Sequence, residues 1–368
     1  MAEILTNPFT PQSGLEPKIL GGRRELVEEF SSLLDKRNEN EYFHLLLLGE
    51  WGRGKTSLLK YYKKISQNKA YKAVYTSLAK SAPRESYRDV LSSIVEEISF
   101  GLGLEIDTSK FSNKSKNVAI LLIEALQKIF KKSNSQLLVI LIDDIQNISD
   151  MPKVLDLLRL ALSNEDFIRE TNVLFVLSST PSGWGNFLKK YDPIGRFFRK
   201  KQILDKLSRD DLIETISNTL SGTGVVFKDD IIDLCWDYSE GHPYELQLLA
   251  NHLYDNHMRG VVSKECWDIS LLNTLKDLGI EYFSSLYDKA SEREKELLAI
   301  FAQKKEYLSI PELKNIVIFE EKIKNYPISN IKNFVYRLLD KDLLLRRDDK
   351  RYRILDKMFA EYILKFRQ

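Results

Sequence analysis

The stretch that decides the fold is LLLLGEWGRGKTSLLK, residues 45–60. Four leucines lead into a turn that holds three glycines within six residues, and the turn leads into Lys55 and Thr56. This spacing fits G-x-x-x-x-G-K-[ST], a loop whose backbone N–H groups wrap a polyphosphate. The glycines allow a tight backbone, and the following helix directs its positive end at the anion. The stretch therefore predicts a buried strand, a phosphate-binding loop and a helix.

The polar side chains of this loop have separate tasks. Lys55 supplies a positive charge to the β- and γ-phosphates, and the hydroxyl of Thr56 can ligate Mg²⁺. ATP with Mg²⁺ is the ligand that we expect. The residues predicted to bind the nucleotide at this loop are Gly49, Gly52, Arg53, Gly54, Lys55, Thr56 and Ser57.

Two later apolar runs also end in polar groups. QLLVILIDD (136–144) ends in Asp143, predicted to lie on the metal side, and Asp144, the candidate base that polarises the attacking water. NVLFVLSST (172–180) ends in three hydroxyl residues, of which Ser179 is favoured as the γ-phosphate contact and Thr180 is second. Simple capping of a strand end is the alternative for Ser179.

Strand-like and helical patterns alternate along the first 206 residues. This alternation predicts an α/β fold, a doubly wound parallel sheet with helices on both faces. The strand-like runs are 43–48, 72–77, 136–142, 173–178 and 201–204, and the helical patterns are 24–36, about 55–66, 84–101, 117–132, 152–165 and 184–190.

Composition and the N-terminal sequence argue against a cysteine-based metal or redox protein, a membrane-spanning protein and a secreted protein. The chain has 368 residues, a net charge of +2 and two cysteines without metal-ligand or redox spacing. Its longest aliphatic runs have about six residues, whereas a membrane helix needs about 20. The N-terminus has no signal-peptide pattern, so we expect a cytoplasmic protein that does not act in a membrane.

The three polar elements, in this order and followed by helices, resemble the AAA+ and STAND branches of P-loop ATPases over about residues 7–280. ILGGRREL (19–26) looks like their entry motif near the adenine, which implies a nucleotide contact for Arg23. EGHPYELQLL (240–249) is similar to the lid of a prokaryotic group related to archaeal origin-recognition initiators, and it implies that Pro243 lies against the base. Arg196, or Arg199 as second choice, matches the arginine that reaches a neighbouring subunit's site in a homo-oligomer; a solvated basic rim is the alternative.

The resemblance implies four parts. They are an N-terminal arm (1–22), a P-loop ATPase core (23–206), a helical lid (207–280) and a C-terminal winged-helix domain (281–368). Three helical patterns and a hairpin with its turn at Asp348 and Asp349 carry the last assignment. In DNA-binding winged helices the third helix enters the major groove and the hairpin contacts phosphates.

Charge supports an anionic partner at this end. Residues 285–368 contain 19 Lys and Arg and 14 Asp and Glu, which leaves an excess of positive charge. The residues predicted to contact duplex DNA are Lys332, Asn333, Tyr336, Arg337, Arg346, Arg347, Lys350, Arg351 and Arg353. Protein docking or autoinhibition by the same domain is the alternative.

Two departures from the AAA+ pattern favour a slow switch over a fast motor. AAA+ enzymes usually have Glu where this chain has Asp144, and the lid offers no second-sensor arginine. The first hypothesis is therefore a slowly hydrolysing ATPase that couples nucleotide state to DNA binding, with Lys55, Asp144, Ser179 and Arg196 as catalytic residues. The second is a STAND-like signalling ATPase that docks a protein or autoinhibits without DNA.

Overall fold

The computed structural model describes residues 6–11, 19–38, 44–79, 86–148, 151–190, 192–320 and 327–367. The chain forms two compact units, one within Gln12–Leu207 and one within Ser208–Gln368, to which residues 6–11 also belong. Parts of the predicted arm 1–22, and the starts predicted at residues 43 and 84, lie outside the described residues. None of the described helices is long and apolar enough to span a membrane.

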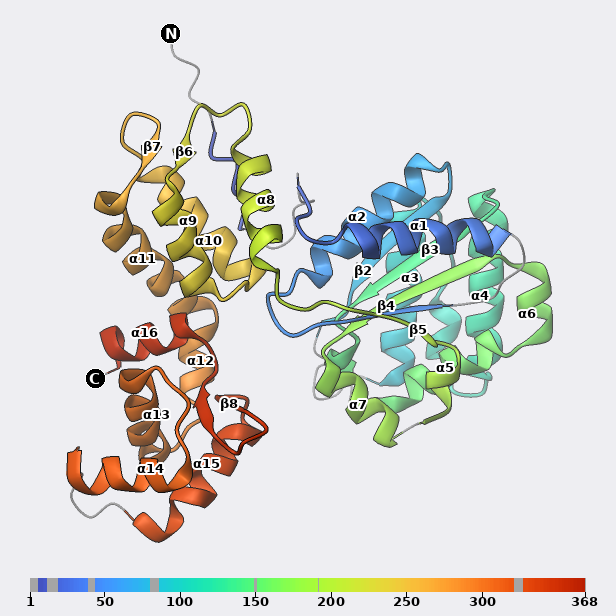
Figure 1. Ribbon diagram of the computed structural model, residues 1–368. Helices are drawn as coiled ribbons and strands as arrows, with labels where there is room; N and C mark the ends of the chain where they lie inside the picture. Colours follow the sequence, from blue (N-terminus) through green and yellow to red (C-terminus); the bar gives the residue numbers. More distant parts are fainter. Residues whose placement is uncertain are drawn as a thin grey trace. The chain divides into compact units, whose positions relative to one another are not determined.

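A five-stranded sheet is the centre of the first unit (Figure 1). Its order is β2-β3-β4-β1-β5, and every neighbouring pair is parallel. Parallel pairing needs a crossover between consecutive strands, and helices supply these crossovers. The predicted doubly wound α/β core is confirmed. The strands are β1 (Leu45–Leu48), β2 (Lys72–Ser77), β3 (Leu138–Asp143), β4 (Val173–Ser179) and β5 (Lys200–Ile203).

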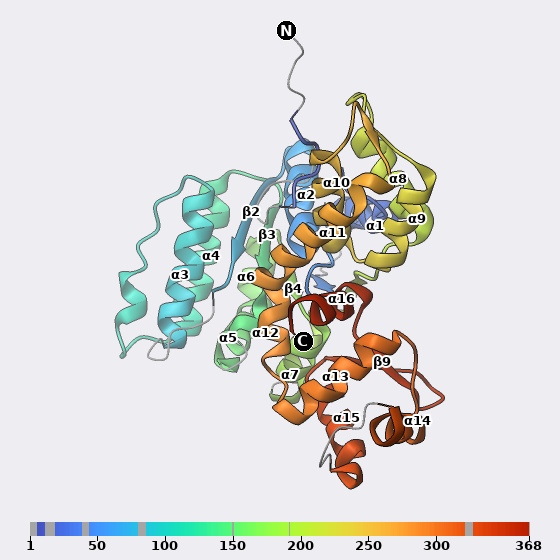
Figure 2. The same cartoon turned by 90° about the vertical axis from the view of Figure 1, so that its left-hand side faces the viewer.

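Helices cover both faces of this sheet, so the central strands are apolar on both sides. One face packs against the first two helices and the other against the remaining five (Figures 1 and 2). The helices are α1 (Arg24–Asn38), α2 (Lys55–Asn68), α3 (Tyr87–Gly101), α4 (Val118–Ser133), α5 (Pro152–Leu162), α6 (Glu165–Glu170) and α7 (Pro181–Lys190).

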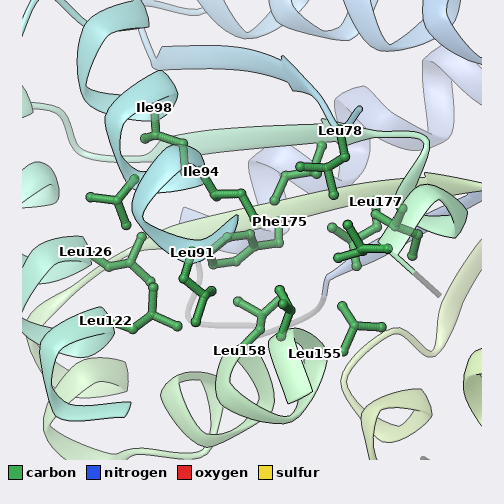
Figure 3. Close-up of a pocket in the computed structure, with 15 residues that line it drawn as sticks. Leu78, Leu91, Ile94, Ile98, Leu122, Leu126, Leu155, Leu158, Phe175 and Leu177 are labelled. Atoms are coloured by element: carbon green, nitrogen blue, oxygen red, sulfur yellow. The ribbon is translucent and has the colours of Figure 1, made fainter. Parts of the chain in front are cut away.

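A small cavity lies on the second face, between the sheet and α3, α4 and α5 (Figure 3). Every side chain that lines it is apolar; Phe175 and Leu177 come from β4, and Leu91 and Ile94 from α3. It offers no group for acid–base or phosphate chemistry. Polar side chains gather instead at the carboxyl ends of the strands, where the candidate site lies.

The register brings these strand ends to one edge. Ser77 pairs with Asp143, and Leu48 pairs with Ser179. The loop after β1 therefore begins beside the ends of β3 and β4. Parallel α/β sheets bind ligands at this edge, where helix N-termini also converge.

One helix of this unit was not predicted. The pattern over 152–165 corresponds to α5, which ends at Leu162, whereas α6 begins at Glu165, the last residue of the predicted range. The side chain of Asn164 caps α6, accepting from the Phe167 N–H at 2.8 Å. The other helices and strands of this unit lie within a few residues of the predicted ranges.

The second unit begins with helices α8 (Arg209–Leu220), α9 (Asp229–Ser239), α10 (Pro243–Asp255) and α11 (Lys264–Leu278). An all-helical segment was predicted here, but β6 (Val226–Phe227) and β7 (Val261–Val262) form a short parallel pair. Each strand has two residues and follows a glycine-rich turn, too short for an alternating pattern to be visible in the sequence. Helix continues from α11 through 279–283 into α12 (Ser284–Tyr287), so the predicted boundary at 280/281 falls inside a helical run.

The remaining elements follow the predicted order of three helices and a hairpin, and a further helix comes after the hairpin. Leu308 forms an isolated antiparallel bridge with Tyr352 of the hairpin. The elements are α13 (Glu292–Lys304), α14 (Ile310–Asn315), α15 (Ile331–Asp340), β8 (Leu344–Arg346), β9 (Tyr352–Ile354) and α16 (Lys357–Phe366).

Residues 6–11 are anchored to the second unit. Phe9 is 2% exposed and stacks on Phe227, with a ring-centroid distance of 5.8 Å. The amide of Asn7 donates to the Asn251 carbonyl at 2.9 Å, and the amide of Asn251 donates to the Phe9 carbonyl at 2.8 Å. Reciprocal hydrogen bonds and a buried ring give this short segment a defined position.

We expect Phe9→Ala to lower the free energy of unfolding of this unit by about 3 kcal/mol, because it removes a buried ring that the arm cannot replace. Hydrogen exchange should show faster exchange along α10, measured against Ile280→Ala in the same unit, where the side chain is 85% exposed. Unchanged exchange along α10 would contradict the anchoring.

Candidate functional site

The loop after β1 leaves the first turn of α2 uncapped by any side chain. Gly54 occupies the N-cap position with φ +89°, in the left-handed region, and a Cβ built there would meet no atom within 4 Å. Gly52 also has a positive φ, of 70°. The N–H groups and the positive dipole of a 14-residue helix are thus available to an anion.

Two contacts hold the loop against the chain that follows β5. A Cβ on Gly49 would lie 3.0 Å from the Cβ of Leu204, so only glycine fits without a shift. The guanidinium of Arg23 donates to the Asp205 carbonyl at 2.6 Å and to the Arg53 carbonyl at 3.4 Å. Arg23, predicted as a nucleotide contact, therefore also braces the loop.

Lys55 is buried in the loop. Its Nζ donates to the carbonyls of Gly49 at 2.9 Å and Glu50 at 3.1 Å. Burial lowers the pKa of Lys55, and the carboxylates of Asp144 and Asp143 oppose that shift. The amine is thus held by the loop's own carbonyls, within electrostatic reach of Asp144 and Asp143.

The carboxylate of Asp143 is the most connected group of the site. Its Oδ2 accepts from the Thr56 hydroxyl at 2.6 Å and from the Tyr75 hydroxyl at 3.0 Å. Its Oδ1 accepts from the Ser178 hydroxyl and from the Asp144 N–H, the latter at 3.1 Å. Burial, and next the charge of Asp143, raises the pKa of Tyr75, which keeps this phenol a neutral donor.

This oxygen-only set fits Mg²⁺. A hydroxyl and a carboxylate in contact are hard ligands, and Mg²⁺ completes its shell with phosphate oxygens and water. Within the described residues no cluster of three or more His, Cys, Asp or Glu forms a metal cage. A metal here would depend on Thr56, Asp143 and the phosphates of the nucleotide.

Asp144 lies beside this group in a left-handed backbone conformation, φ +55°. Its N–H also lies 3.1 Å from the Ser178 hydroxyl, and its Oδ1 accepts from the Gln146 amide at 2.8 Å. Burial, and next the neighbouring Asp143, raises the pKa of Asp144, while the Gln146 hydrogen bond lowers it. The carboxylate thus has a fixed orientation close to Lys55 and Asp143.

The hydroxyl residues at the end of β4 have separate roles. Ser178 lies on the same side as Asp143 and bonds to it. Ser179 is fully buried, and its hydroxyl has no hydrogen-bond partner among the described residues. Thr180 caps α7 by accepting from the Gly183 N–H at 3.0 Å. Of these three residues, Ser178 is the one that contacts the Asp143 carboxylate. A phosphate contact by Ser179 stays a prediction.

Two other predicted residues belong to elements other than the phosphate loop and the strand ends. Arg196 ends the short helix Asp192–Arg196 and is exposed, as is Arg199. Pro243 is the first residue of α10 in the second unit. The predicted roles of Arg196 and Pro243 stay predictions.

Sequence reasoning missed Tyr75, Ser178 and Gln146 as site residues. Nothing in the sequence distinguishes Tyr75 from other strand residues. The register of β2 against β3 pairs it with Leu141, two residues before Asp143, and from there its hydroxyl reaches the carboxylate. Ser178 was one of three adjacent hydroxyls, and the alternation of side chains along a strand decides which of them faces the acid. Gln146 gave no signal, since a polar residue after a strand end is common.

The residues predicted to contact DNA divide into two sets. Four arginines are engaged by carboxylates: Arg337 with Glu294, Arg347 with Asp349, Arg351 with Glu312 and Arg353 with Glu240. Within the described chain, Lys332, Arg346 and Lys350 form no ion pair, and Lys332 lies over the Tyr336 ring at 5.6 Å. The cations available to a phosphate are therefore fewer than the count of basic residues.

Comparisons with known proteins agree with this geometry. Residues 24–249 match a family model described as an ATPase domain predominantly from Archaea. A search of curated proteins found no match.

Solved structures cover nearly the whole chain at low identity. A Walker-type ATPase of Pyrococcus abyssi has a TM-score of 0.68 at 15% identity, covering 97% of this chain and 99% of that one. The ORC2 protein of Aeropyrum pernix, solved in ADPNP–ADP complexes, has 0.67 at 15% (96% and 97% covered). The ORC1 protein of the same organism, solved with DNA, has 0.52 at 13% (98% and 97%). At such identity these likenesses show a shared fold.

The open space at Gly54 makes a direct test of the loop possible. We expect Gly54→Ala to weaken binding of a fluorescent ATP analogue about a hundredfold, because a methyl group projects into the phosphate cradle; this equals the loss of one or two charge-assisted hydrogen bonds.

Gly103→Ala is the matched control, since Gly103 also has a positive φ, of 67°, and open space around it. Both variants should lose about 1 kcal/mol of stability from backbone strain, and only Gly54→Ala should lose nucleotide. Equal nucleotide affinities would contradict the assignment of this cradle.

Proposed function

The chain belongs to the family of ATPase domains found predominantly in Archaea, and from this premise we propose that it is a slow, Mg²⁺-dependent ATP switch that controls binding to duplex DNA. The observation that carries the nucleotide part is the 2.6 Å hydrogen bond between the Thr56 hydroxyl and Asp143. It brings together the hydroxyl of the phosphate loop and the acid of β3, the two protein groups that hold Mg²⁺ in P-loop ATPases.

The proposed chemistry assigns one task to each residue. The N–H groups of the loop and Lys55 bind the phosphates. Thr56 and Asp143 would hold Mg²⁺, which when bound would neutralise charge on the phosphate oxygens. Asp144 takes the proton from a water molecule whose oxygen attacks the γ-phosphorus. The bond from that phosphorus to the β–γ bridging oxygen breaks, and ADP and phosphate leave.

Further contacts complete the proposal. Arg23 and Pro243 contact the base, Ser179 senses the γ-phosphate, and the exposed Arg196 reaches the site of a second copy in a homo-oligomer. The arm 1–22, core 23–206, lid 207–280 and winged helix 281–368 act as four parts. Two buried free cysteines, Cys235 and Cys266, suit a reducing, cytoplasmic location.

DNA is the proposed partner of the C-terminal part. Its helix α15 and its hairpin present Lys332, Arg346 and Lys350 without carboxylate partners in the described chain, together with Asn333 and Tyr336. Cations placed on a helix and an adjacent hairpin suit a groove and its flanking phosphates. The fold that this chain shares with the ORC1 protein of Aeropyrum pernix, which was solved in complex with DNA, supports DNA as the partner.

The ion pairs favour a second candidate, the STAND-like switch. Arg337, Arg347, Arg351 and Arg353 are occupied by carboxylates of the chain itself, and Arg353 binds the lid residue Glu240. A C-terminal part held to the lid by its own charges suits autoinhibition or protein docking. A nucleotide-dependent change of oligomer size in the absence of DNA would favour this candidate.

We expect Asp144→Asn to lower the rate of phosphate release about a hundredfold while nucleotide affinity stays close to that of the wild type, because an amide cannot accept the proton. Lys55→Ala should instead lose nucleotide binding. Asp166→Asn, an exposed carboxylate of the same unit, is the control. Wild-type turnover in Asp144→Asn would remove Asp144 from the mechanism.

We expect affinity for generic duplex DNA, measured by fluorescence anisotropy across a salt series, to fall steeply with salt and to differ between ATP and ADP. The double variant Arg346→Gln/Lys350→Gln should lower the salt slope by about 2, since each lost phosphate contact removes about one unit. Arg351→Gln, whose guanidinium is engaged by Glu312, should change it little. No salt-sensitive binding in either nucleotide state would reject DNA as partner.

A further inference from the structure

Gln146 connects the candidate base to the end of a neighbouring strand. It lies in the short helix Ile145–Ile148 that follows β3. Its Nε2 donates to Oδ1 of Asp144 at 2.8 Å, and its Oε1 accepts from the Thr180 N–H at 3.3 Å. One side chain thus joins the ends of β3 and β4 through their polar groups.

The chemistry of these partners determines the orientation of the amide. A carboxylate can only accept, so the NH₂ group of Gln146 must face Asp144. A backbone N–H can only donate, so the amide oxygen must face Thr180. A flipped amide would lose both hydrogen bonds and place an oxygen against the carboxylate.

The N-terminus of α7 leaves room for this side chain. A Cβ built on Gly183 would lie 2.5 Å from the Cβ of Gln146, 2.8 Å from Oγ1 of Thr180 and 3.0 Å from Oγ of Ser179. A side chain at Gly183 would therefore displace Gln146. Because Gly183 has no side chain, the first turn of α7 can pack directly on Gln146.

Asp144 depends on this contact for its direction. Among the described residues, Gln146 is the only hydrogen-bond donor to the Asp144 carboxylate. The other hydrogen bonds of Asp144 are made by its backbone: its N–H donates to Asp143 and Ser178, and its carbonyl accepts from the Asn147 N–H at 2.9 Å. Because aspartate is one methylene shorter than glutamate, a small rotation moves its oxygens away from an attacking water, and effective proton transfer requires hydrogen-bond reach.

We infer that Gln146 is a positioning residue for ATP hydrolysis, which orients the Asp144 carboxylate and ties it to the end of β4. This inference rests on the proposed role of Asp144 as the base. Gln146 itself contacts neither water nor phosphate in this role; it acts through Asp144 alone. Its effect must therefore vanish when the Asp144 carboxylate is absent.

A double-mutant cycle tests this dependence. Phosphate release and affinity for a fluorescent ATP analogue are measured for the wild type, Gln146→Leu, Asp144→Asn and the double variant. Gln146→Leu should lower kcat about tenfold with nucleotide affinity nearly unchanged, the size seen when an outer support of a reacting group is removed. In the Asp144→Asn background the same substitution should have little further effect.

A second variant displaces Gln146 and leaves its amide intact. Gly183→Ala should lower kcat by a similar factor, because the new methyl group pushes against the glutamine. Since the same methyl group also meets the hydroxyls of Thr180 and Ser179, Gly183→Ala is measured in the Asp144→Asn background as well, where it should have little further effect. Gly185→Ala is the matched control, since it lies in the same helix and a Cβ there meets nothing within 4 Å. Thermal unfolding of each variant separates a loss of folded protein from a loss of turnover.

Each result has one meaning. A low kcat in Gln146→Leu and Gly183→Ala, with no further loss on top of Asp144→Asn, supports the inference. Equal losses in both backgrounds, or an unchanged or raised kcat in Gln146→Leu, would overturn it while the proposed function stands. If Asp144→Asn itself keeps wild-type turnover, the proposed base is wrong and the inference fails with it.

Discussion

The set of hydrogen bonds to the buried Asp143 carboxylate is the interaction on which the rest of this structure depends. Asp143 is 1% exposed, and a charge so far from water is stable only if hydrogen bonds replace its hydration. Three hydroxyls and one N–H do so, and they come from the first turn of α2, from β2, from β4 and from the residue that follows Asp143. The carboxylate can be satisfied only when these segments end at the same edge in the correct register.

This constraint also shapes the residue beside it. The N–H of Asp144 is directed at Asp143 and Ser178, which requires the backbone to turn into the left-handed region. Aspartate tolerates that region better than a branched residue does. In this conformation the Asp144 carboxylate takes no part in the hydrogen bonds to Asp143. The amide of Gln146 instead sets the direction of the Asp144 carboxylate. The metal-side acid and the candidate base are thus adjacent in sequence but supported by different elements.

The sequence predicted the part of this arrangement that depends on local spacing. The loop, α2 and the acids of β3 follow from glycine positions and apolar runs. Thr56 and Asp143 were both predicted at the metal, and the structure places them in hydrogen-bond contact. Tyr75 could not be predicted, because its role depends on a register between strands more than 60 residues apart. The hydrogen bond from Ser178 to Asp143 could not be predicted either, because it depends on the phase of β4, which three adjacent hydroxyls do not reveal.

The same distinction between local pattern and distant contact governs the C-terminal charges. An excess of basic residues describes composition, but the field outside the protein depends on which cations already have a partner. The guanidinium of Arg353 donates to both oxygens of Glu240, at 2.6 and 3.1 Å, across 113 positions of sequence. Such a fork-shaped pair is geometrically specific, and breaking it exposes a half-buried carboxylate. Because Glu240 directly precedes Gly241, His242 and Pro243, this pair connects the hairpin to the turn that begins α10 within the second unit.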